Sequence, residues 1–164
     1  MNTKISPEYL IRAYVWAVLK ANTNMKESDY GGKIPIIPIS DDREFANLGK
    51  PYIVWGYATD PTFRGEHYRQ RASMSFLVYS NNFNQLQEIL TILNATFNRE
   101  DDSAADINAF TSTIPQFIGI RFGTVSVGFM EGPAPEETEG GRQSAVLNIR
   151  YEYYVDYEVT TRIV

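Results

Sequence analysis

The chain has 164 residues, of which 43% are hydrophobic and 21% charged, and its formal net charge is -5. This composition predicts one soluble globular domain over residues 1–164 and excludes a disordered or membrane-embedded chain. The acidic balance argues against a general affinity for nucleic acid, although a local basic patch can still contact it. Cysteine is absent, which excludes disulfides and thiolate metal sites. Because the N-terminus has no secretory signal, we expect assembly in a cytoplasm.

Three segments have the features of helices. Residues 6–21 begin with a capping Ser6, a proline and an acid, and continue with apolar residues at helical spacing. Residues 82–97 begin with Asn82 as a cap and have the clearest apolar stripe of the chain. A shorter helix is predicted for residues 103–110, with Ser103 as its cap.

Four segments have the alternation of strands. Residues 52–59 and 72–80 predict an antiparallel pair, and residues 117–130 and 144–160 predict two long closing strands. The apolar phase of residues 117–130 changes at Gly123, which predicts a bulge there. The assembled order predicts an α+β fold, with a mostly antiparallel sheet, long C-terminal strands and helices packed on one face. The last strand is long enough to extend past its own domain, which favours completion by neighbours.

Residues 33–39, KIPIIPI, are apolar enough to require burial but contain two prolines. Proline is excluded from the middle of a sheet, so the segment is expected to be an edge strand or an extended arm. Two interpretations follow: a segment packed on its own domain, or an arm laid on an adjacent subunit. In the second, Ile36 and Ile37 are candidate interface residues.

Residues 60–71 join the first two strands and hold the only histidine and three arginines. A single His67 beside Glu66 is a weak ligand set without further histidine or cysteine partners. A solvated hairpin loop is the alternative, and a third interpretation is a basic contact with an acidic partner or with DNA phosphates. The candidate interface residues of this segment are Arg64, His67, Arg69 and Arg71.

Residues 131–142, EGPAPEETEGGR, are too polar to pack and too long for a tight turn. We therefore expect an exposed acidic loop between the two closing strands, with Glu136, Glu137 and Glu139 as candidate interface residues. The two loops have opposite charge tendencies, which favours docking of a partner or neighbour.

The sequence contains none of the common phosphate-binding, dinucleotide-binding, hydrolase or zinc-protease motifs. We therefore expect no enzyme activity, no cofactor and no metal site.

The order of elements resembles a known family. The chain is similar to the tail terminator, or tail-completion, proteins of tailed bacteriophages. The similarity lies in an N-terminal amphipathic helix, the strands PYIVWGYAT and SFLVYS, the helix FNQLQEILTILNATF and two closing strands. Residues 33–39 and 131–142 are not matched to the pattern of that family.

This resemblance implies a structural virion protein of the tail or neck. Family members form a hexameric ring on the end of the tail tube, stop its polymerisation and present a surface to the neck or head connector. The resemblance thus implies a homo-oligomer, contact with the tail tube protein, DNA near the ring lumen and no membrane contact. Another neck or head-completion connector protein is the first alternative. An oligomeric ligand-binding module and a hydrolase with an acid pair are the others.

Overall fold

The computed structural model describes residues 6–39, 45, 48–59, 69–99, 101–110, 117–129 and 143–154. This part of the chain forms three α-helices, one 3-10 helix and a five-stranded sheet, which confirms the predicted α+β class. In chain order the elements are α1 (Pro7–Asn22), η1 (Glu27–Tyr30), β1 (Ile36–Pro38), β2 (Tyr52–Thr59), β3 (Arg69–Ser80), α2 (Phe83–Phe97), α3 (Asp101–Phe110), β4 (Phe117–Phe129) and β5 (Gln143–Tyr154).

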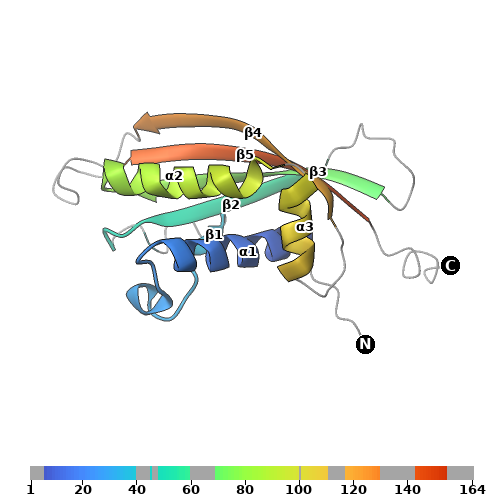
Figure 1. Ribbon diagram of the computed structural model, residues 1–164. Helices are drawn as coiled ribbons and strands as arrows, with labels where there is room; N and C mark the ends of the chain where they lie inside the picture. Colours follow the sequence, from blue (N-terminus) through green and yellow to red (C-terminus); the bar gives the residue numbers. More distant parts are fainter. Residues whose placement is uncertain are drawn as a thin grey trace.

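The sheet has the strand order β1-β2-β3-β5-β4. Only β1 and β2 are parallel among the pairs of this sheet, and the pairs β2–β3, β3–β5 and β4–β5 are antiparallel. Figure 1 shows α1, α2 and α3 on one side of the sheet. We call the opposite side the open face. Within the described residues, no helix is long and apolar enough to cross a membrane.

The main core lies between the helices and the sheet. Alternate residues of β3 and β5 face it, as the sequence pattern predicts, and α2 covers them with one apolar stripe. The fully buried members from these three elements are Met74, Phe76, Val78, Leu147, Ile149, Leu86, Leu93 and Phe97.

A smaller aromatic cluster covers one end of the open face. Tyr52 and Tyr79 are register partners with ring centroids 5.0 Å apart. The ring centroid of Phe45 lies 6.3 Å from that of Tyr52 and 5.4 Å from that of Tyr30. The Tyr30 hydroxyl donates a hydrogen bond to the carbonyl of Pro51, and burial raises the pKa of this tyrosine. The first half of β2 is therefore buried on both faces.

Two of the predicted helix caps are confirmed. The Ser6 hydroxyl accepts a 3.4 Å hydrogen bond from the amide of Tyr9, and the side-chain Oδ1 of Asn82 accepts from the backbone amides of Asn84 and Gln85. The predicted cap at Ser103 is wrong, because α3 begins at Asp101. Ser103 is instead buried inside α3, where its hydroxyl donates a 2.7 Å hydrogen bond to the carbonyl of Thr96.

The predicted bulge in β4 is confirmed, since the β4–β5 register shifts between Phe122 and Val125. A second shift, between Phe117 and Gly119, was not indicated by the sequence. Beside it, the side-chain amide of Asn108 in α3 donates to the carbonyl of Phe117 and accepts from its amide, both at 2.7 Å. This side chain occupies the place of a neighbouring strand at that end of β4.

The segment at residues 33–39 packs on its own domain. Ile36 and Ile37 lie in β1, an edge strand beside β2, and are 0% and 5% exposed. The Nε of Arg12 also donates a 2.5 Å hydrogen bond to the carbonyl of Ile36. The structure therefore corrects the assignment of these two isoleucines as interface residues, because their side chains retain almost no surface for a neighbour.

Leu90→Ala tests the packing of α2 on the sheet. Leu90 is 7% exposed, so truncation removes buried methyl groups and leaves a cavity. We expect the free energy of unfolding to fall by about 2 to 5 kcal/mol, measured by urea denaturation. A loss below about 0.5 kcal/mol is typical of surface substitutions and would contradict this packing.

Candidate functional site

Four arginines line a groove of about 400 Å³ on the open face. They come from three neighbouring strands, near the ends where β3 and β4 begin and β5 finishes. We call this feature the arginine groove. Its lining residues are Arg69, Arg71, Ile118, Gly119, Arg121, Arg150, Tyr151 and Glu152.

Strand register places these charges side by side. Arg71 pairs with Glu152, and Arg150 pairs with Arg121. Paired residues point to the same face of a sheet, and this face is opposite to that of buried Met74 and Ile149. The groove therefore gathers positive charge in a chain that is acidic as a whole.

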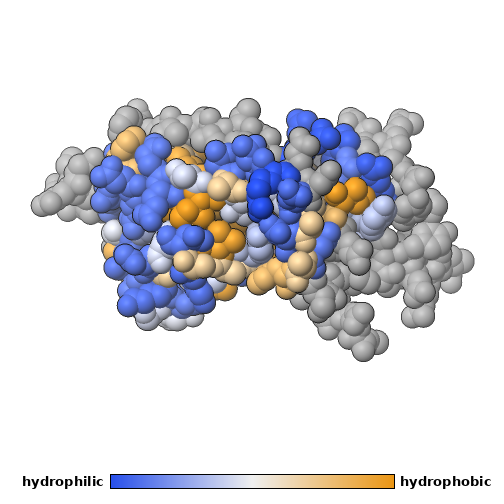
Figure 2. Space-filling model, in the orientation of Figure 1, coloured by the Kyte–Doolittle hydropathy of each residue, from blue (hydrophilic) through white to orange (hydrophobic). Residues whose placement is uncertain are grey.

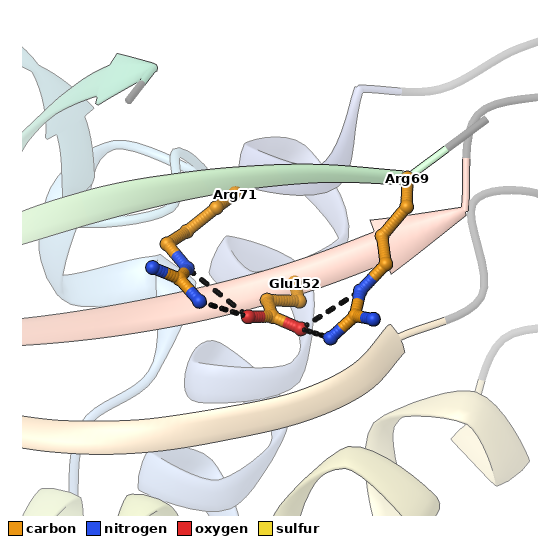
Figure 3. A network of polar contacts seen from close by, with 3 residues as sticks. All are labelled: Arg69, Arg71 and Glu152. Atoms are coloured by element: carbon orange, nitrogen blue, oxygen red, sulfur yellow. Dashed lines mark hydrogen bonds and ion pairs between the residues drawn. The ribbon is translucent and has the colours of Figure 1, made fainter. Parts of the chain in front are cut away.

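Glu152 is held between two arginines of β3, as Figure 3 shows. Arg71 donates from Nε and Nη2 to one carboxylate oxygen, at 3.0 and 2.7 Å. Arg69 donates to the other oxygen, from Nε at 3.1 Å and also from Nη2. Both carboxylate oxygens are thus occupied, and β3 and β5 are tied together at this end.

These contacts set the ionisation of the carboxylate. Partial burial by itself raises the pKa of Glu152, but the hydrogen bonds from Arg69 and Arg71 outweigh burial and hold the pKa below its ordinary value. Glu152 therefore stays a carboxylate at neutral pH. A carboxylate in this state is a weak general base.

The other two arginines have no such partner. Arg121 and Arg150 are exposed, and in the described part of the chain neither makes a hydrogen bond or an ion pair. Like charges directly opposite on two strands, such as these two arginines, destabilise a sheet.

The arginine groove as a whole has four positive groups and one negative group, a formal charge of +3. It is suited to holding carboxylates or phosphates, because guanidinium groups bind both through paired hydrogen bonds.

Glu152→Gln tests the electrostatic role of the carboxylate. A depressed folded-state pKa contributes stability above the unfolded value of about 4.5, and this contribution disappears as pH falls through the folded value. We expect the variant to lose about 1 kcal/mol of unfolding free energy at neutral pH, the upper value for an ion pair near the surface. The difference from wild type should shrink as the pH is lowered below about 4.5, measured by denaturant titration. A difference that persists undiminished at acid pH would contradict this role.

The structure brings together two of the residues predicted from sequence. Arg69 and Arg71 lie in β3, which starts earlier than the predicted strand, and so belong to a rigid strand instead of a loop. Arg64, His67, Glu136, Glu137 and Glu139 lie outside the described residues.

The sequence did not indicate Arg121, Arg150 or Glu152 as site residues. Each stands on the polar side of an alternating strand, a position that usually means solvent exposure. Their proximity to Arg69 and Arg71 depends on strand order, for which no local pattern exists.

The described residues contain no group of three or more histidine, cysteine, aspartate or glutamate side chains able to hold a metal ion. A second, more open groove of about 420 Å³ lies between α1 and α2, where Figure 2 shows exposed apolar residues. Its lining residues are Tyr14, Val18, Asn22, Ile92, Ala95, Thr96 and Arg99.

No protein-family model matches the chain, and no curated protein matches its sequence. A solved structure titled "Virion of native gene transfer agent (GTA) particle" contains a chain with which this chain shares 12% sequence identity. The superposition covers 92% of this chain and 99% of that chain, with a TM-score of 0.49.

Proposed function

We propose that the chain is a structural virion protein that forms a ring on the end of a phage tail tube, ends tube polymerisation and provides the surface for head joining. The observation that carries this proposal is the arginine groove, a charged docking surface built on three paired strands. Strands hold their side chains in fixed positions, so little order has to be gained when a partner binds. The layout of helices and strands, which resembles the tail terminator family, supports the same role.

We also propose that the chain is not an enzyme and needs no cofactor. Among the described residues, Glu152 is the only carboxylate that lines the groove, and two arginines hold it in its charged form. A general acid–base group needs a pKa near the working pH, and that of Glu152 is shifted in the other direction. The groove is therefore better suited to binding an anionic surface than to proton transfer.

The proposed partners are the tail tube protein, a neck or head-connector protein and further copies of this chain, with six as the expected number in the ring. DNA passing through the lumen would lie close to the ring without specific contacts. Assembly is expected in the host cytoplasm, and the finished protein belongs to the tail or neck of the virion. Another neck or head-completion protein is the alternative function.

Tail assembly without the protein tests the function. We expect tails of excess length, or tails that fail to join heads, because nothing then ends the tube. The measurement is the length distribution and head attachment of particles by electron microscopy, with the wild-type protein added back as control. Tails of normal length that do not join heads favour the neck alternative. Tails of normal length that also join heads normally would contradict both the tail terminator function and the neck alternative.

A further inference from the structure

We infer that the arginine groove of one copy binds the acidic loop, residues 131–142, of a second copy. The loop follows β4 and precedes β5, and its sequence has four glutamates and one arginine, a formal charge of -3. The groove has a formal charge of +3. This inference goes beyond the proposed function, because it concerns contact between copies and holds whether or not they end a tail tube.

The two charged features belong to opposite ends of the same sheet. The loop is attached between Phe129 and Gln143, which are register partners. Arg150 and Glu152 lie seven and nine residues further along β5, which at strand rise is about 23 and 30 Å away. The arginine groove and the attachment points of the acidic loop therefore lie toward opposite ends of the strands of one copy.

The length of the loop disfavours docking in the groove of its own copy. In its middle, Glu136 is seven residues from both attachment points and Glu137 is six residues from the nearer one, a reach of about 20 to 25 Å only when fully extended. That reach ends near Arg150 and does not bring a carboxylate to Arg69 or Arg71 without complete stretching. A second copy can present the same loop without this cost in conformational entropy.

The composition of the groove favours carboxylates over a nucleic acid. The chain as a whole has a net charge of -5, which disfavours a long and continuous phosphate backbone. A short segment with carboxylates needs only the positive groups of the groove itself for binding. Two of these, Arg121 and Arg150, are exposed and make no ion pair or hydrogen bond within the described residues. Residues 131–142, which join β4 to β5, are a segment of opposite charge that the chain itself supplies.

Contact between unlike ends has a geometric consequence. Each copy then has one donor surface and one acceptor surface, which is a heterologous interface. Repetition of such a contact closes into a ring or extends as a filament. If one copy lacks a working acceptor surface and a second copy lacks a working donor surface, only one contact between them is possible. Such a pair must stop at two copies.

Three variants of the full chain test this contact. The groove variant is Arg121→Gln with Arg150→Gln, and the loop variant is Glu136→Gln with Glu137→Gln and Glu139→Gln. Lys26→Gln with Lys50→Gln is the matched control, because it removes two exposed positive charges outside the groove. Self-association is measured by sedimentation equilibrium at low salt and again at high salt.

We expect the groove and loop variants to associate about tenfold more weakly than wild type, from the loss of two or more exposed charge pairs. The control should associate like wild type, and wild-type association should weaken with added salt. A mixture of the groove and loop variants should form dimers about as readily as wild type, because the intact loop of one variant meets the intact groove of the other. Species larger than the dimer should be about tenfold less favoured than in wild type.

Three results would overturn the inference. In the first, the groove and loop variants associate as strongly as wild type. In the second, the wild-type chain is monomeric even at about millimolar concentration, beyond the range of specific weak contacts. In the third, a short single-stranded DNA probe binds wild type and the loop variant but not the groove variant, while self-association is unchanged in all three, which would assign the groove to nucleic acid. The circular dichroism spectrum of each variant confirms that the fold is retained.

Discussion

Phe97→Ala should lower the free energy of unfolding by about 3 to 5 kcal/mol, the range for a buried aromatic truncated to alanine. Phe97 is the last residue of α2 and is 0% exposed. Its ring stacks on that of Phe76 in β3, with centroids 6.0 Å apart and 18° between the ring planes. The substitution removes this contact and leaves a cavity where α2 rests on the centre of the sheet.

The first residue of the same helix supplies the control. Phe83 is 49% exposed, so Phe83→Ala removes the same side chain from the same helix with little loss of buried area. We expect a change of less than about 1 kcal/mol for this control, close to the usual range for surface substitutions. Equal losses for the two variants, in parallel urea titrations, would mean that α2 does not pack on the sheet through Phe97.

Much of the fold was predictable because its signals are local. The helix caps at Ser6 and Asn82 depend on residues within one turn. The alternation of apolar and polar residues in 72–80 predicts which side of the strand is buried. The bulge near Gly123 was predictable because a change of apolar phase needs an extra residue.

The errors fell where a distant contact decides the structure. Ser103 has the residue type of a cap, but its hydroxyl is used by the carbonyl of Thr96 in the preceding helix. Arg69 and Arg71 were assigned to a loop because polar residues end a predicted strand, whereas pairing with β5 extends β3 to include them. The salt bridges to Glu152, which lies 83 residues after Arg69, strengthen that pairing.

The arginine groove also depends on contacts between residues that are distant in the sequence. The sequence identifies its residues as polar and exposed, and it predicts a basic segment near 60–71. It does not give the strand order that sets β5 between β3 and β4, and this order brings Arg121 and Arg150 into the same groove as Arg71. A local pattern therefore predicted half of the groove and could not predict its other half.

A buried pair between the first helix and the last strand gives the second large effect. The Tyr151 hydroxyl donates a hydrogen bond to the Glu8 carboxylate, and these residues are 1% and 4% exposed. Burial raises the pKa of Tyr151, and the hydrogen bond to Glu8 raises it further, so the phenol stays protonated as a donor. The pair joins the start of α1 to β5.

Tyr151→Phe should lower the free energy of unfolding by about 1 to 3 kcal/mol, the range for leaving a buried hydrogen-bonding group without its partner. The ring is kept, so its packing against Phe117, 6.0 Å away between centroids, is retained. Glu8→Ala should also destabilise the fold, because it leaves a buried hydroxyl without an acceptor. The double variant should lose less than the sum of the two, since neither partner then remains unpaired. Strictly additive losses in a double-mutant cycle, measured by urea denaturation, would show that the two side chains do not interact.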